Sequence, residues 1–158
     1  MKLVAREYAK VLGHYQFDRI VGLPYAALPI ASAISLEMNV PLIYPRREAK
    51  AYGTKAAIEG EYKAGERVVI IDDLVSTGET KVEAIDKLKS VGLKIVAIVV
   101  LIDREMGAKK FLNDLGYEFE AVVGLYRLLP MWRQLESITQ EQANEVKQFL
   151  GQYQKSKL

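Results

Sequence analysis

Short apolar runs alternate along the chain with amphipathic segments. The apolar runs hold almost no polar residues and predict strands buried on both faces, over 19–23, 40–44, 67–71, 93–102 and 119–123. Apolar residues at helical spacing predict helices at the N-terminus as far as Gly13, over 28–38, from Ser76 to Gly92, over 108–115, and from Thr139 onwards. This alternation is typical of a parallel sheet flanked by helices. The pattern therefore predicts an α/β fold, with residues 1–158 forming a single domain.

Two local patterns add detail to this outline. Val82, Ile85 and Leu88 share one face of the helix that ends at Gly92, so we expect this face to be buried. Segment 45–60 is rich in charge and has no clear strand pattern. We therefore expect it to be a long mobile loop. Long loops without regular structure are often functional.

Composition narrows the chemistry. The 158 residues carry a formal net charge of +2, which gives no support by itself for nucleic-acid binding. The absence of cysteine excludes disulfides and thiolate metal sites, and His14 is the one histidine. Any metal is therefore expected to be a hard, oxygen-bound ion such as Mg²⁺. The sequence has neither an apolar run long enough to span a bilayer nor a secretory signal, so we expect a cytoplasmic protein.

The strongest chemical signal is the segment VVIIDDLVSTGET at 68–80. A buried strand is followed by a short turn, and residues 76–80 then open a helix. A helix N-terminus offers free N–H groups and a partial positive charge, which suit a phosphate. Gly78 allows a close backbone approach, and Thr77 and Thr80 supply hydroxyl donors. The turn therefore predicts a phosphate site.

Asp72 and Asp73 stand directly before this turn. Adjacent carboxylates suit either the diol of a ribose or a bound Mg²⁺, so a 5-phosphorylated ribose would satisfy both halves of the segment. The other common phosphate motifs, G-x-x-x-x-G-K-[ST] and G-x-G-x-x-G, are absent. Phosphoacceptor receiver domains also carry paired acids, but there the pair follows the first strand. A solvated acid pair beside an ordinary helix cap is the remaining alternative.

Segment 72–80 resembles the binding signature of type I phosphoribosyltransferases for 5-phosphoribosyl-1-pyrophosphate (PRPP). Segments 21–29, 46–55, 58–78 and 100–107 are similar, in the same order, to orotate phosphoribosyltransferases, in particular to the phosphoribosyltransferase part of UMP synthases. The resemblance implies the type I phosphoribosyltransferase fold. It also implies Mg²⁺-dependent transfer of phosphoribosyl from PRPP to orotate, which yields orotidine 5′-monophosphate and pyrophosphate in pyrimidine nucleotide synthesis.

The resemblance implies a role for each matching residue of the PRPP signature. Asp72 and Asp73 would hold the ribose hydroxyls. The 5-phosphate would be held, largely through backbone N–H groups, by Val75, Ser76, Thr77, Gly78, Glu79 and Thr80. Glu79 is a departure, since an acid in a phosphate cradle is unfavourable unless its side chain points away.

The resemblance also implies two pyrophosphate-binding segments. The turn at 23–27 includes Tyr25, Ala26 and Ala27, and many bacterial relatives carry a lysine there, so this chain would offer backbone donors only. The second segment is a cationic loop that closes over pyrophosphate and reaches into the site of a partner subunit in a homodimer; its matching residues are Arg46, Arg47, Lys50 and Tyr52. By composition alone this loop reads as a solvated charged segment.

Three of the matched residues, Arg47, Lys50 and Asp73, are the expected catalytic residues. Arg104 matches the arginine that contacts the orotate carboxylate, and a structural ion pair with Asp103 is the alternative. Mg²⁺ is expected to be carried by PRPP rather than bound directly by the protein. No covalent nucleophile is needed for displacement at C1 of the ribose.

One expectation departs from the family pattern. Relatives usually begin with a strand-and-loop hood that carries Lys-Ser-Gly and helps to cover orotate, and we expect this chain to lack that hood. Three hypotheses follow: an orotate phosphoribosyltransferase that works without it, a phosphoribosyltransferase for another base, or a non-catalytic regulatory module that binds PRPP or a nucleotide. Arg104 and the cationic loop favour the first hypothesis.

Overall fold

A computed structural model of the chain describes residues 1–46 and 57–156, and within them six strands form one sheet. The strands are β1 (Arg19–Gly22), β2 (Leu42–Pro45), β3 (Ile58–Glu59), β4 (Arg67–Val75), β5 (Lys94–Asp103) and β6 (Glu118–Gly124). Their order in the sheet is β3-β2-β1-β4-β5-β6. β3 pairs antiparallel with β2, and every other neighbouring pair is parallel. The predicted α/β fold with a largely parallel sheet is confirmed.

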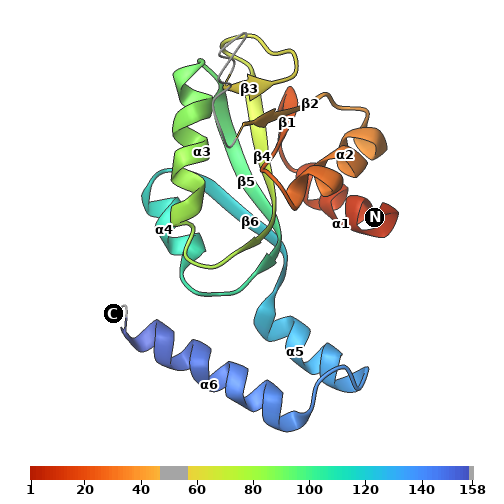
Figure 1. Cartoon of the computed structure of the whole chain (residues 1–158), viewed down its shortest axis with the longest axis vertical. Coiled ribbons are helices and arrows are strands. Elements are labelled where there is room, and N and C mark those ends of the chain that lie inside the picture. The colour runs from red at the N-terminus through yellow and green to blue at the C-terminus, as the bar shows by residue number, and fades with distance from the viewer. Residues whose placement is uncertain (47–56, 157–158) are drawn as a thin grey trace.

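Helices cover both faces of the sheet (Figure 1). They are α1 (Lys2–Leu12), α2 (Ala27–Met38), α3 (Glu79–Ser90), α4 (Ala108–Asp114), α5 (Leu125–Gln134) and α6 (Gln140–Ser156). α1 and α2 pack on one face, and α3 and α4 pack on the other. α5 and α6 lie beyond the carboxyl end of β6, away from the two covering layers (Figure 1). No helix in the described segments combines the length and apolar character that a membrane crossing requires.

The register of strand pairing aligns the buried side chains in rows across the sheet. Ile20 of β1 lies beside Val69 of β4, which lies beside Ala97 of β5, and all belong to the core under α1 and α2. The next residues along β1 and β4, Val21 and Ile70, belong to the core under α3 and α4. Successive strand residues point to opposite faces, so an apolar run without polar alternation fills both layers.

The order of the strands creates a crevice at one edge of the sheet. After β1 the chain crosses through α2 to β2 on one side, and after β4 it crosses through α3 to β5 on the other side. β1 and β4 are neighbours, so their continuing chains diverge. In open α/β sheets a ligand binds at such a divergence, beyond the carboxyl ends of the strands.

The central strand is longer than expected. The sequence pattern ended it at residue 71, but β4 continues to Val75 because Leu74 pairs with Ile102 and Val75 with Asp103 of β5. The acidic pair therefore belongs to the strand rather than to the turn that follows it. Backbone pairing with β5 thus places these carboxylates on a rigid element.

The expectation of a loop over 45–60 is wrong at both ends. Pro45 is the last residue of β2, and Ile58–Glu59 form β3, with Tyr44 opposite Glu59 and Pro45 opposite Ile58. A strand this short carries no period that a sequence pattern could reveal. The part of the expected loop at 47–56 lies outside the described residues.

One side-chain contact joins the first helix to the central strand. Tyr8 is fully buried, and its hydroxyl donates to the backbone carbonyl of Asp72. We expect Tyr8→Phe to lower the free energy of unfolding by about 1–2 kcal/mol, because a buried carbonyl loses a donor. Urea denaturation followed by circular dichroism measures this change. Tyr117→Phe is the control, since among residues 1–46 and 57–156 that hydroxyl has a single hydrogen bond, an exposed one with Lys89 at 3.4 Å. Equal losses of unfolding free energy in the two variants would contradict a stabilising role for the Tyr8–Asp72 hydrogen bond.

Candidate functional site

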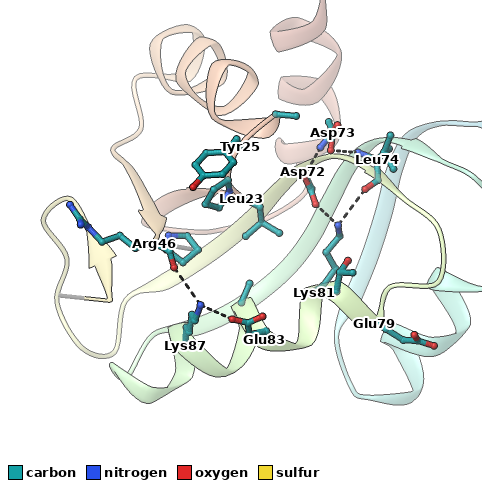
Figure 2. A pocket seen from close by; sticks show the side chains of 15 residues that line it. Leu23, Tyr25, Arg46, Asp72, Asp73, Leu74, Glu79, Lys81, Glu83 and Lys87 are labelled. Carbon is teal, nitrogen blue, oxygen red and sulfur yellow. Dashed lines mark hydrogen bonds and ion pairs between the residues drawn. The ribbon is translucent and has the colours of Figure 1, made fainter. Parts of the chain in front are cut away.

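A cavity of about 530 Å³ opens at the carboxyl ends of β1 and β4. Its walls are the turn after β1, the end of β2, the last residues of β4 and the part of α3 from Glu79 to Lys87 (Figure 2). This is the crevice predicted by the strand order. Its volume is in the usual range for a small-molecule site.

The two carboxylates of β4 differ in their environments. Asp72 is 8% exposed, and its Oδ1 accepts a hydrogen bond from the Asp73 N–H at 2.9 Å. Asp73 is half-buried, and its Oδ1 accepts from the Leu74 N–H at 2.9 Å. Within the described part of the chain, no N–H group donates to Asp73 Oδ2. Asp73 therefore has an acceptor oxygen available for a ligand.

Lys81 of α3 reaches back to the acidic pair (Figure 2). Its ammonium group donates to Asp72 Oδ2 and also lies 3.3 Å from the backbone carbonyl of Leu74. Burial raises the pKa of the Asp72 carboxyl, and the adjacent Lys81 ammonium opposes that rise. The result is a buried ion pair in the wall of the cavity.

Sequence reasoning missed Lys81. It placed Val82, Ile85 and Leu88 on the buried face of α3, whereas Lys81 is buried with Ile85 and Leu88, and Val82 is only partly buried. The signal was present, because positions 81, 85 and 88 follow the i, i+4, i+7 spacing of one helix face. A lysine on an otherwise apolar face indicates a buried partner.

The turn between β4 and α3 leaves the helix N-terminus open. Gly78 precedes α3 with φ at +87°, and no side chain among the described residues caps this end of the helix. The first N–H groups of α3 are therefore available to an anion. Glu79 and Thr80 are exposed, and the Glu79 side chain points away from Asp72 and Lys81 (Figure 2). This is the orientation in which an acid at this position is tolerated.

The turn after β1 forms the opposite wall. The Leu23 N–H donates to the Ile71 carbonyl at 3.0 Å, which ties this turn to β4. The Pro24–Tyr25 peptide is cis. Tyr25 and Ala26 are exposed and line the cavity, whereas Ala27 is buried at the start of α2. The structure thus brings the expected pyrophosphate turn to the cavity, apart from the Ala27 side chain.

Of the expected cationic loop, the structure describes Arg46. Its guanidinium pairs with Glu59 of β3, and its backbone carbonyl accepts from Lys87 of α3 at 3.4 Å. Arg46 lies in the cavity wall with its charge already paired. Arg47, Lys50 and Tyr52 lie outside the described residues.

Arg104 lies on the other side of the phosphate turn. Its backbone N–H donates to the Val75 carbonyl at 2.9 Å, and its Nη1 donates to Ser76 Oγ at 3.1 Å. The side chain is exposed and borders an apolar groove of about 410 Å³ between α5 and α6 rather than the main cavity. The Asp103 Oδ1 accepts from the Glu105 N–H at 2.7 Å, and the ion pairs of the described residues do not include Asp103 with Arg104. Arg104 therefore contacts the phosphate turn from outside the cavity.

Comparisons with a family model, with curated proteins and with solved structures all find similarity to phosphoribosyltransferases. Residues 1–118 match the model of the phosphoribosyl transferase domain. The chain is 42% identical to a bifunctional PyrF/PyrE enzyme of Nostoc over 135 residues, covering 85% of this chain and 28% of that protein. It is 38% identical to an orotate phosphoribosyltransferase of Pyrococcus furiosus, covering 81% of this chain and 71% of the relative.

A solved structure of Leishmania donovani UMP synthase is similar with a TM-score of 0.90 and 75% sequence identity. The match covers 96% of this chain and 33% of that chain. Across several curated relatives, this chain spans from 28% to 60% of the relative's own length.

The open helix N-terminus yields a test with a matched control. In Gly78→Ala, an added Cβ would lie 3.2 Å from the side chains of Phe111 and Leu112, at a backbone angle that L-residues rarely adopt. If residues 76–80 hold the 5-phosphate of PRPP, as the sequence resemblance implies, we expect the dissociation constant for PRPP to rise by about tenfold or more, because this turn has to move. Calorimetry measures this constant.

The control is Gly116→Ala. Gly116 has a similar φ of +85°, and an added Cβ there would meet nothing within 4 Å. We expect a loss of about 1–2 kcal/mol in the free energy of unfolding with PRPP affinity unchanged. Equal PRPP affinities for the two variants would contradict the assignment of the turn.

Proposed function

Because this chain belongs to the phosphoribosyltransferase family, we propose that it transfers the phosphoribosyl group of PRPP to orotate, giving orotidine 5′-monophosphate and pyrophosphate. The observation that carries the proposal is one cavity that combines paired carboxylates with an uncapped helix N-terminus at the switch point of the sheet. The orotate phosphoribosyltransferases among its relatives support orotate as the acceptor.

The proposed reaction is displacement at C1 of the ribose, with pyrophosphate leaving and a nitrogen of orotate attacking. Backbone N–H groups of residues 75–80 hold the 5-phosphate, and Asp73 with Asp72 holds the ribose hydroxyls. The turn at 23–27 faces the pyrophosphate. A ligand bound at all three places presents C1 to the acceptor in one orientation, so the protein contributes mainly positioning and charge stabilisation.

Mg²⁺ is the proposed cofactor, carried into the site by the pyrophosphate of PRPP. Within residues 1–46 and 57–156, no three His, Cys, Asp or Glu side chains cluster closely enough to hold a metal ion. The Asp72 carboxylate already accepts from Lys81, so the donor set fits an ion held mainly by substrate oxygens. When bound, the ion offsets negative charge on the leaving pyrophosphate.

Arg47, Lys50 and Tyr52 complete the proposal as a loop that covers the pyrophosphate in the partner's site of a homodimer. Arg47 and Lys50 stabilise charge on the leaving group, and closure excludes water that would hydrolyse PRPP. Arg104 is the proposed contact for the orotate carboxylate. Its guanidinium donates to Ser76 Oγ at 3.1 Å outside the main cavity, so this role requires the side chain to turn toward the acceptor when orotate binds.

The direct test of activity mixes the protein with orotate, PRPP and Mg²⁺ and follows the ultraviolet absorbance of orotate. We expect loss of orotate with matching release of pyrophosphate, and no reaction when Mg²⁺ is chelated. PRPP binding without orotate consumption would favour another acceptor base or a binding module. Absence of PRPP binding would contradict the proposed function.

Shared active sites allow a complementation test. Asp73→Asn and Arg47→Ala are each expected to be inactive alone, since one weakens ribose binding and the other removes a cation at the pyrophosphate. If the loop acts across the dimer, mixed dimers contain one intact site. After mixing and exchange we expect about a quarter of wild-type activity to return. Gel filtration establishes the dimer, and a mixture that stays inactive despite exchange would contradict the shared site.

A further inference from the structure

Lys81 is a buried cation in the wall of the proposed PRPP cavity. We propose that Lys81 is a positioning residue that holds the Asp72 carboxylate in one orientation and offsets its charge, so that the ribose of an anionic substrate can bind beside it. This inference rests on the proposed function and assigns a role to a residue outside the expected signature.

The contacts around Asp72 leave its carboxylate little freedom. Oδ1 accepts from the Asp73 N–H at 2.9 Å, and Oδ2 accepts from Lys81 Nζ. Lys81 is 6% exposed and Asp72 is 8% exposed, so solvent competes little with these bonds. A side chain engaged at both oxygens keeps one rotamer, and its remaining lone pairs keep a constant direction.

The position of Lys81 on its helix argues for a functional rather than a stabilising role. It occupies a face that is otherwise buried and apolar, with Ile85 and Leu88. A buried ion pair contributes little stability compared with well-packed apolar side chains of similar size, because both charges lose their hydration. An apolar residue would fill the same place, so the lysine is explained by what it does to Asp72.

The charges in the cavity show why that effect matters. Its walls contain the carboxylates of Asp72, Asp73, Glu79 and Glu83. Glu83 pairs with Lys87 at 2.7 Å, and Glu79 is exposed and points away from Asp72 and Lys81 (Figure 2). Lys81 pairs with Asp72, so Asp73 is the carboxylate of the β4 pair that has no cationic partner among the described residues. A substrate with several phosphate charges meets less repulsion in such a site.

The test compares Lys81→Met with Lys81→Arg, Asp72→Asn and the double variant Lys81→Met/Asp72→Asn, using PRPP calorimetry and steady-state kinetics. We expect Lys81→Met to raise both Kd and KM for PRPP by about tenfold or more, with KM for orotate nearly unchanged. Lys81→Arg keeps the charge and is expected to restore most of the affinity. In the Asp72→Asn background, adding Lys81→Met is expected to change Kd by less than about twofold, because residues that act through one another are not additive.

Lys89→Met is the matched control, since Lys89 lies on the same helix, is exposed and does not line the cavity. Thermal unfolding monitors folding in every variant. If Lys81→Met does not fold, two variants still test the role of Lys81. These are Lys81→Arg and the double variant, which buries no unpaired charge. Wild-type PRPP affinity in Lys81→Met, or additive losses of affinity in the double variant, would overturn the role proposed for Lys81 and leave the proposed function standing. A wild-type protein that neither binds PRPP nor consumes orotate would overturn the proposed function, and the inference with it.

Discussion

Asp72 is held from both faces of the sheet, and the rest of the site is arranged around it. From one face, the Tyr8 hydroxyl of α1 donates to its backbone carbonyl; from the other, Lys81 of α3 donates to its carboxylate. Along the sheet, its strand pairs with β5 up to Val75. An acidic residue that is almost fully buried is costly unless it is paired, so both helical layers contribute to keeping it there.

This anchoring gives the cavity a rigid frame. The acidic pair lies on a strand. The end of β4 is tied to the residue after β5, because the Arg104 N–H donates to the Val75 carbonyl, and the opposite wall is tied to β4 through Leu23 and Ile71. Each wall is thus positioned by backbone hydrogen bonds rather than by side chains alone. A reaction that depends on orientation and charge stabilisation needs such a frame, since a small misplacement of the reacting atoms costs much of the rate.

The sequence predicted the fold class, most of the elements and the position of the turn at Gly78, because these depend on local signals. Apolar runs fill both layers of a parallel sheet, and Gly78 marks a turn with a left-handed backbone. The sequence did not predict the strand ends and the strand that depend on contacts between residues distant in the chain. The pairing of β5 with Leu74 and Val75 extends β4, and β3 exists only because Glu59 and Ile58 lie against the end of β2.

Two further features were missed for different reasons. α5 was not predicted, because Pro130 lies inside it and a proline in the interior of a helix usually interrupts it. Lys81 was missed because a charged residue was not considered for the buried face of α3, although its spacing from Ile85 placed it there. Lys81 and Asp72 are nine residues apart, and the turn between β4 and α3 brings them together as an ion pair. The assignments of Arg47, Lys50 and Tyr52 rest on resemblance and stay predictions.

A crystal structure of this protein with PRPP and Mg²⁺ would test the proposed site most directly. We expect the 5-phosphate within hydrogen-bond distance of the backbone N–H groups of 76–80, a ribose hydroxyl on Asp73, and the Asp72–Lys81 pair intact beside it. A phosphate bound elsewhere, with the cavity between β1 and β4 empty, would contradict it.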